Sequence, residues 1–294
     1  MKPACFVCLS LFIVASLFGQ SNPVPGPRRP LSSPTFSRLP QWPLLAPSGL
    51  IAAPAHSKND SQSSGPDFAA AVLYGSGGNN TRSVAVADVN GDGKPDLLVA
   101  NWCQYEGNCP NGTIDVLLGN GDGTFQSAVS YGSGGWRAIS IAVADVNGDS
   151  KPDIVVVNCG ASDSSDCGEG VIGVLLGNGD GTFEAAMTFG SGGFDLESVA
   201  VADVNGDGKS DLVVVNQCSI VINCSHGSVG VLLGNGDGTF KTAVPYDTST
   251  LWAYSVTIAD VNRDGKPDLL VTSFLWQRSA ELSKWHCGSS GGKW

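Results

Sequence analysis

From about residue 83 the chain consists of short apolar runs of small and branched side chains, separated by turns rich in glycine and aspartate. The run SVAVAD at 83–88 leads into an acidic loop, and DLLVAN at 96–101 leads out of it. TIDVLLG at 113–119 ends in an Asn-Gly turn, and TFQSAVSYG at 124–132 completes the unit. Short runs bounded by Asn-Gly and Asp-Gly dipeptides are typical of strands in tight hairpins. The pattern predicts a four-stranded antiparallel sheet.

This unit is repeated along the chain. Versions of the nine-residue loop DVNGDGKPD begin at Asp88, Asp145, Asp203 and Asp260, 57 or 58 residues apart. The sequence LLGNGDGTF occurs three times with the same period. One small sheet cannot bury both of its faces, so successive units must stack around an axis or along a line. We predict an all-β fold, a complete or partial β-propeller of about four four-stranded antiparallel blades.

Composition supports this class and narrows the partners. The 294 residues are 42% hydrophobic, which is enough for a core, and 39 glycines with 2 methionines favour strands and turns over long helices. The formal net charge is −11, and the 16 Lys and Arg residues form no basic cluster. Because phosphate binding needs clustered positive charge, we expect no nucleic-acid partner, whereas cations are expected.

The N-terminal part differs from the repeats. Lys2, followed by an apolar stretch at 4–18, predicts a signal peptide at 1–20 that is too short to span a bilayer comfortably. An uncleaved anchor is the alternative. Residues 21–65 are rich in Pro and Ser and are predicted to form a disordered linker before the repeat domain at 66–276. We therefore expect a secreted or cell-surface protein with no other membrane span.

The tail at 277–294 breaks the repeat pattern and contains an unpaired Cys287. Codons for its segment WHCGSSGGKW can, when read one base later, encode a close match to GSVGVLLGN at 227–235, where strand three is due. We interpret the tail as a frameshift product of a gene for a longer propeller, whose open blade edges favour self-association. The segment FAAAVLYGSGG at 68–78 matches the last strand of a repeat, and we expect it to close the final blade.

Each acidic loop carries oxygen ligands at its odd positions. In a turn this tight these positions point inward, so the side chains of Asp88, Asn90, Asp92 and Asp96 converge with the carbonyl oxygen of Lys94. Such a set suits a hard cation, and calcium tolerates its irregular geometry better than magnesium. We expect about one Ca²⁺ per repeat, up to four in all. The predicted ligands of the other three loops are Asp145, Asn147, Asp149, Lys151, Asp153, Asp203, Asn205, Asp207, Lys209, Asp211, Asp260, Asn262, Asp264, Lys266 and Asp268.

A divalent ion accounts for the crowding of charge in these loops. They hold 12 of the 27 acidic residues, whose mutual repulsion an ion turns into attraction. An EF-hand does not fit, because the flanks are strands and position twelve is a valine in every loop: Val99, Val156, Val214 and Val271. Asx-rich turns that bind no metal are the alternative.

The four loops are not equal. Ser150 stands at the sixth position, where the other loops have glycine, and it is strained if that position requires a positive φ. Arg263 replaces a glycine at the fourth position of the last loop and adds a positive charge beside the ion. We predict weaker binding in these two loops. Asn120 and Asp122 of the Asn-Gly turn are interpreted as turn formers rather than ligands.

Three cysteine pairs lie between strands two and three of successive repeats: Cys103 with Cys109, Cys159 with Cys167, and Cys218 with Cys224. In an oxidising compartment we expect three local disulfides, each closing an exposed loop that we call a finger. Zinc is the weaker alternative, because the spacing is not CxxC and only His226 lies near.

The loop pattern DxNxDGxxD, together with YGSGG at 74–78 and 131–135 and FGSGG at 189–193, resembles the FG-GAP or VCBS repeat of bacterial secreted proteins. The same repeat builds the propeller of integrin alpha subunits. The resemblance covers about residues 68–274. It implies a calcium-bound propeller outside the cell and leaves the ligand undetermined.

An up-and-down blade places the acidic loops and Asn-Gly turns at one end and the fingers and GSGG segments at the other. Three aromatic residues, Trp136, Phe194 and Trp252, follow the segments that connect successive blades and are candidates for a ligand face, with packing between blades as the alternative. We expect a binding or adhesion module for an extracellular protein or carbohydrate. A rigid spacer in a larger surface protein is the alternative.

Nothing in the sequence indicates an enzyme. The motifs GxSxG, HExxH and GxxxxGK[ST] do not occur, and the three histidines lie in unrelated contexts. A propeller hydrolase would need a carboxylate pair on the finger end, where the available acidic residues are Glu106, Asp163, Asp166 and Glu169.

Overall fold

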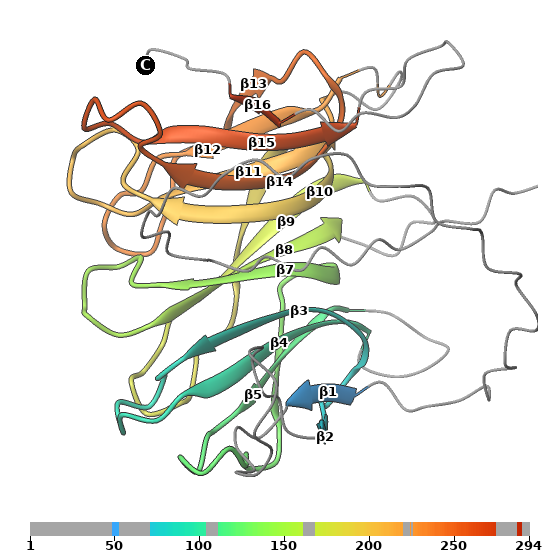
Figure 1. Cartoon of the computed structure of the whole chain (residues 1–294), viewed down its shortest axis with the longest axis vertical. Coiled ribbons are helices and arrows are strands. Elements are labelled where there is room, and N and C mark those ends of the chain that lie inside the picture. The colour runs from blue at the N-terminus through green and yellow to red at the C-terminus, as the bar shows by residue number, and fades with distance from the viewer. Residues whose placement is uncertain are drawn as a thin grey trace, which may run out of the picture. The chain divides into compact units, whose positions relative to one another are not determined.

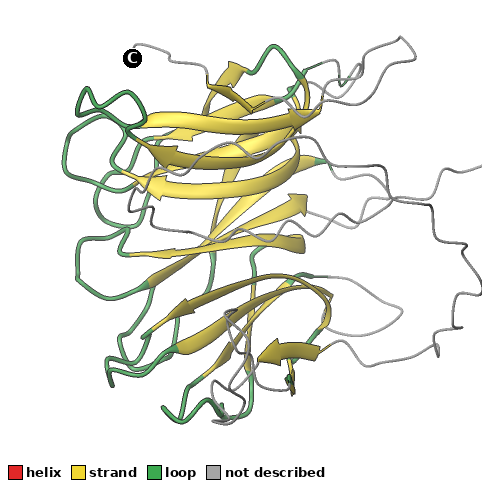
Figure 2. Cartoon of the chain, viewed as in Figure 1, coloured by secondary structure: helices red, strands yellow, loops and turns green. Residues whose placement is uncertain are grey.

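The computed structural model of the chain describes residues 49–52, 71–103, 111–160, 168–219, 224, 226–274 and 287–289. All of them belong to one compact unit, Leu45–Trp294. These residues form strands and turns without a helix (Figure 2), and none of their elements is an apolar helix long enough to cross a membrane. The predicted signal peptide and most of the predicted linker and tail lie outside the described residues.

The first blade has the predicted form. Its strands β3 (Asn79–Ala87), β4 (Asp96–Cys103), β5 (Thr113–Leu117) and β6 (Val129–Gly132) pair antiparallel in chain order (Figure 1). The buried strands are rich in branched apolar residues, as expected for strands covered on both faces. The last strand is shorter than predicted, and an isolated bridge from Gly119 to Phe125 takes the place of its first part.

The second and third blades form one seven-stranded sheet. It contains β7 (Trp136–Ala144), β8 (Asp153–Gly160), β9 (Glu169–Leu175), β10 (Met187–Ala202), β11 (Asp211–Cys218), β12 (Ser228–Leu232) and β13 (Val244–Asp247). The first part of β10 pairs with β9 as an outer strand, and its second part pairs with β11 as an inner strand. The sequence predicted two strands here. They merge because β9 is longer at its start than the equivalent strand β5 of blade one. Phe194 therefore pairs with Glu169 on one side and with Cys218 on the other, and β10 continues without a break.

The fourth blade consists of β14 (Leu251–Ala259), β15 (Asp268–Phe274) and β16 (Cys287–Ser289). Strand β16 lies in the tail that we expected to be irregular, and it takes the place of strand three beside β15, which gives the backbone of β15 its hydrogen-bond partners. The described residues therefore form a propeller-like array of antiparallel blades, with no closed barrel.

Two short strands precede the first blade. Strand β2 (Val72–Gly75) has the sequence of an outer strand, as predicted, but it pairs with β1 (Gly49–Ala52) and does not complete the fourth blade. Strand β1 lies in the stretch that we predicted to be a disordered linker. Its pairing supplies partners for the backbone groups along one edge of β2, which explains why this segment is extended.

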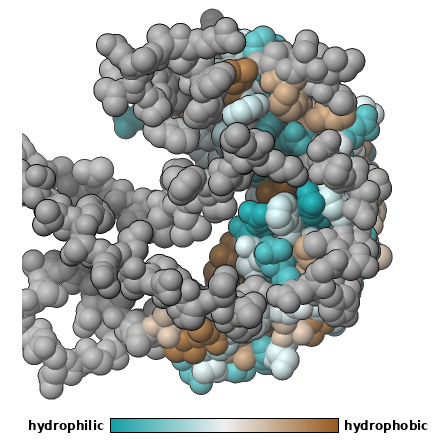
Figure 3. All heavy atoms as spheres, turned by 90° about the vertical axis from the view of Figure 1, so that its right-hand side faces the viewer, coloured by the Kyte–Doolittle hydropathy of each residue, from teal (hydrophilic) through white to brown (hydrophobic). Residues whose placement is uncertain are grey.

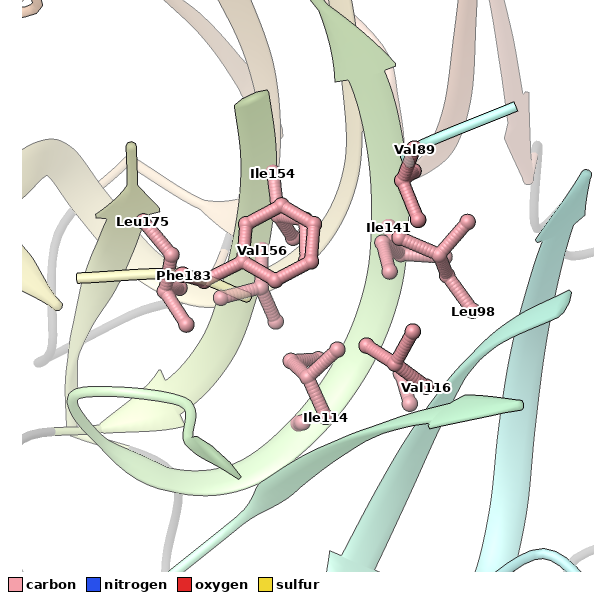
Figure 4. Close-up of a cluster of buried hydrophobic side chains, with 11 residues drawn as sticks. Val89, Leu98, Ile114, Val116, Ile141, Ile154, Val156, Leu175 and Phe183 are labelled. Carbon is pink, nitrogen blue, oxygen red and sulfur yellow. The ribbon is translucent and has the colours of Figure 1, made fainter. Parts of the chain in front are cut away.

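The core lies between neighbouring blades. In the first junction, Leu98 and Ile114 of blade one pack against Ile141 and Val156 of blade two (Figure 4). The same positions form the cores of the next two junctions. Aromatic pairs in T-shaped contact, such as Tyr131 with Phe183 at 5.6 Å between ring centroids, join the outer strand of one blade to the Asn-Gly turn of the next.

A buried carboxyl group lies near the start of the third inner strand. Burial raises the pKa of Glu197 to about 7, although the side chain of Gln217 donates a hydrogen bond to it. The negative charge of Asp195 raises this pKa further, and the positive charge of Arg82 in blade one lowers it. At neutral pH a proton is therefore partly retained on a group that is ionised in the unfolded chain.

This group predicts a pH dependence of stability. Between about pH 4.5 and 7 the unfolded chain loses the proton of Glu197 while the folded chain keeps it, so the free energy of unfolding falls as the pH rises. Glu197→Gln keeps the acceptor oxygen for Gln217 and removes the titration. We expect the variant to be more stable than wild type by about 1 to 2 kcal/mol at pH 7.5 and equal to it near pH 4. Urea unfolding at both pH values measures the difference, and an equal gain at both would contradict the assignment.

Candidate cation-binding loops

Each acidic loop joins the first and second strands of a blade and is held in a tight turn by its own side chains. In the first loop the backbone N–H groups of Gly91 and Gly93 donate to Asp88 at 2.8 Å. Asn90 accepts from the N–H of Asp92 at 3.0 Å, and Asp92 accepts from that of Lys94 at 2.9 Å. The second and third loops repeat all these bonds, and the fourth repeats most of them. The first, third and fifth positions thus lie on one exposed turn, and the convergence of their oxygens on a cation stays a prediction.

The ninth position has a second role that the sequence did not indicate. The fully buried carboxylate of Asp96 accepts the N–H of Val89 at the start of its loop and the N–H of Gly119 in the Asn-Gly turn, at 2.9 and 2.7 Å. Asp153 and Asp211 make the same two bonds in blades two and three. One carboxylate therefore ties the acidic loop to the hairpin turn of the same blade. We call this pair of hydrogen bonds the aspartate clamp.

Two loop positions require a left-handed backbone. The sixth position has a φ of 78° at Gly93 and 65° at Ser150. The fourth has a φ of 73° at Gly91 and 61° at Arg263. The strain predicted for Ser150 is confirmed, and Arg263 carries the same strain, because a Cβ atom disfavours this region by roughly 1 kcal/mol.

The charges of the loop act on one another. The N–H of Lys94 lowers the pKa of the exposed Asp92, and the ammonium group of Lys94, 3.2 Å from the carboxylate, acts in the same direction. In the second loop, burial raises the pKa of Asp153, and the nearby charges of Asp149 and Asp145 raise it further. The three carboxylates of one loop are therefore close enough to repel one another.

The oxygen set fits a hard cation in number and kind. A carboxylate or amide oxygen has two lone pairs, and the hydrogen bonds above leave free lone pairs on the oxygens of Asp88, Asn90, Asp92 and Asp96. In the described part of the chain, however, no three His, Cys, Asp or Glu side chains are grouped as a metal-binding cluster. In the first loop Asp92 turns toward Lys94, and the predicted set includes an amide oxygen and a backbone carbonyl beside the carboxylates. A cation would have to draw the fifth-position carboxylate away from the lysine.

The Asn-Gly turns have the structural role that the sequence predicted. Asp122 accepts both the N–H and the hydroxyl of Thr124, at 2.9 and 2.6 Å, and Asn120 donates to the same hydroxyl. The hydrogen bond from the hydroxyl group of Thr124 lowers the pKa of Asp122 most, and the bond from the backbone N–H of Thr124 lowers it further. Gly121 has a φ of 84°, and an added Cβ would meet the side chain of Lys94, so glycine is required there.

The predicted disulfides are present where the structure describes them. Cys218 is bonded to Cys224, with 4.6 Å between their Cα atoms. Cys103 and Cys159 are disulfide-bonded as well, and their predicted partners lie outside the described residues. The disulfide-bonded cysteines at the strand ends, Cys103, Cys159 and Cys218, and the GSGG segments lie at the end of the blades opposite the acidic loops, onto which Figure 3 looks. Described hydrophilic and hydrophobic residues are intermingled there (Figure 3).

The three aromatic candidates for a ligand face have different environments. Trp136 is buried with the guanidinium of Arg137 over its ring at 3.5 Å, so it packs within the blades. Trp252 is exposed but stands one register position later, because Leu251 is the residue that corresponds to Trp136.

Phe194 is half-buried and lines a pocket of about 550 Å³. Phe189 and Phe240 line this pocket too, together with polar residues that include Glu169, Thr188, Lys241 and Thr242.

A buried polar network in the first blade also escaped prediction. Asn101 and Thr113 donate to the carboxylate of Asp115 at 2.5 and 2.9 Å, and burial raises the pKa of Asp115. In blade two the corresponding residue is Gly173, where an added Cβ would clash with the carbonyl oxygen of Ser133. The one available signal was an aspartate within an apolar strand.

Of the acidic residues named for a hydrolase, the structure describes Glu169 alone, and it is exposed.

The blades, the aspartate clamps and the in-register acidic loops define a repeat protein of the β-propeller class. Sequence comparison agrees with this: the FG-GAP-like repeat family matches residues 105–156, 160–214 and 219–271, and the FG-GAP repeat family matches residues 80–117. The chain belongs to the FG-GAP repeat family and contains an integrin-like β-propeller module. No curated protein matches it at a significant level.

The strained loop positions predict stabilising substitutions. Ser150→Gly and Arg263→Gly each remove a Cβ from a left-handed residue, at some cost in unfolded-chain entropy. We expect each to raise the free energy of unfolding by about 0.5 to 1 kcal/mol in the presence of a calcium chelator. Gly93→Ser, the matched reverse change in the first loop, should lower it by a similar amount. Chemical denaturation measures all three, and a stabilising Gly93→Ser would contradict the account.

Proposed function

We propose that the chain is a secreted, calcium-binding β-propeller that acts as a binding or adhesion module for an extracellular protein or carbohydrate. Calcium stabilises the acidic loops, and the opposite end of the blades carries the ligand surface. The protein has no catalytic role.

One observation carries the calcium part of the proposal. The same oxygen positions recur in four loops with nearly the same hydrogen bonds, although the charges of Asp149 and Asp145 add to the burial that raises the pKa of Asp153. An arrangement that is unfavourable for isolated turns becomes favourable around a divalent ion. Four such ions carry eight positive charges, which would offset most of the formal net charge of −11.

The ligand surface is proposed from the shape and chemistry of the finger end. Disulfides stiffen the fingers, which lowers the entropic cost of binding through them. The pocket beside Phe194 combines aromatic rings with hydroxyl and charged groups, which suits a sugar ring or a peptide side chain. A rigid spacer is the second candidate, because stacked blades with apolar junctions resist bending.

Calcium titration of the full chain tests the proposal. Calorimetry should show binding of up to four ions, tighter in the first and third loops than in the second and fourth, and chelation should lower the unfolding temperature by more than about 10 °C. Asp207→Asn retains the hydrogen bond from the N–H of Lys209 and removes one charged ligand, so it should abolish or strongly weaken one site.

The Asn-Gly turn offers a matched control. Asp237→Asn changes the same kind of exposed side chain in the same blade and retains the acceptor for Thr239, so it should leave the titration unchanged. Equal losses in both variants, or unfolding that is indifferent to the chelator, would show that the loops are turns without a metal function.

A binding assay separates a module from a spacer. The labelled full chain is applied to arrays of extracellular-matrix proteins and glycans, with calcium or with chelator. We expect calcium-dependent binding that Phe194→Ala reduces at least tenfold and that Val129→Ala, on the exposed outer strand of blade one, leaves unchanged. Uniformly absent binding would favour the spacer.

A further inference from the structure

Each junction between blades has two halves. The preceding blade contributes the valine at the second position of its acidic loop. The following blade contributes two apolar residues of its first strand. In the first junction Val89 packs with Ile141 and Val143, and a backbone hydrogen bond from Gly181 to the carbonyl of Val89 joins the two blades (Figure 4). We call the half that contains the loop valine the trailing face of a blade, and the half that contains the first-strand residues its leading face.

The leading face of the first blade has no such partner in its inner part. Val84 and Val86 are 48% and 62% exposed. The residues that correspond to Val84 in the next three blades, Ile141, Val199 and Val256, are 9%, 8% and 7% exposed. This position is therefore covered by the preceding blade in blades two, three and four, and it is exposed to solvent in blade one.

The trailing face of the fourth blade is open in the complementary way. Val89 and Val146 are each 2% exposed, whereas the corresponding Val261 is 53% exposed. Thr257 and Ala259 beside it are exposed as well. Two apolar surfaces that are buried against each other at every internal junction are thus presented to solvent by one chain.

The strands at the leading face are complementary to the fourth blade. Strand β2 behaves as an outer strand, since Tyr74 makes the T-shaped contact with Phe125 that Tyr131 makes with Phe183. Strand β1 pairs with β2 in the register that β5 uses with β6, so it occupies the place of strand three. Strands β1 and β2 thus form the outer half of a blade. The positions of its first two strands, next to Val84 and Val86, are not filled by β1 or β2. Strands β14 and β15 of a fourth blade are the two strands of that type.

We propose that the occupant of these faces is a second copy of this chain, bound head to tail. The leading face of one copy receives strands β14 and β15 of its partner, β1 takes the place beside β15 that β16 holds in the single chain, and the reciprocal contact closes a dimer. The structure favours a second copy over closure within one chain, because both faces of a single chain remain exposed. Eight blades in a closed dimer is a number that propellers adopt. The contact uses blade faces, not the open blade edges expected from the sequence.

The oligomeric state of the full chain in calcium tests the proposal. Light scattering at about 50 µM should give twice the mass of one chain. Val86→Asp damages only the leading face and Thr257→Asp only the trailing face, and both residues are exposed in the isolated chain. Each variant alone should therefore be a folded monomer, with the circular dichroism of the wild type and an unfolding temperature that, unlike that of the wild type, does not change with protein concentration. Val129→Asp, at a 54% exposed position on the outer edge, should remain a dimer.

Mixing the two variants gives the decisive result. The Val86→Asp copy keeps an intact trailing face and the Thr257→Asp copy an intact leading face, so a one-to-one mixture should regain a dimer through a single contact. A monomeric wild type, dimers that survive both aspartates, or dissociation by Val129→Asp would each overturn the proposal. So would two folded, monomeric variants that fail to associate when mixed.

Discussion

The aspartate clamp is the interaction on which the rest of the blade depends. A buried carboxylate with no partner would be costly, but Asp96, Asp153 and Asp211 each accept two backbone N–H groups from segments about 30 residues apart. The clamp fixes the acidic loop against the Asn-Gly turn, and the turn in turn contacts the loop of the preceding blade, as Gly181 does with Val89. Local loop geometry and the junction between blades are therefore coupled.

This coupling gives the acidic loops a structural function beside the proposed ion binding. The ninth residue of the first three loops belongs both to the clamp and to the proposed oxygen set, so an ion held by the exposed residues would also restrain the buried ones. The arrangement places the hydrogen-bonded acidic loops at one end of the blades and the disulfide-bonded Cys103, Cys159 and Cys218 at the other. A module built in this way can hold a ligand surface in a fixed shape, which is the property that the proposed binding function needs.

Much of this was predictable from the sequence, for reasons that differ between residues. The strands, loops and turns followed from the period and from Asn-Gly and Asp-Gly dipeptides, and the strain at Ser150 followed from a single missing glycine. The aspartate clamp could not be predicted from the sequence, because the buried Asp96 depends on a hydrogen bond from Gly119, which is far away in sequence. The pairing of β1 with β2 and the continuity of β10 were likewise missed, because they depend on which backbone edges lack a partner. Trp252 was grouped with Trp136 because both follow a blade connection, although the repeat period places Leu251 at that position, and the strand register agrees with the period.

The central claim is that a cation and the clamp act together in each repeat. Hydrogen exchange of the backbone amides, measured on the full chain with calcium and with chelator, tests it most directly. The account predicts that calcium slows exchange at the loop amides of Gly93 and Gly208 and at the clamp amides of Val89 and Val204. Exchange at these amides that is the same with calcium and with chelator would contradict it.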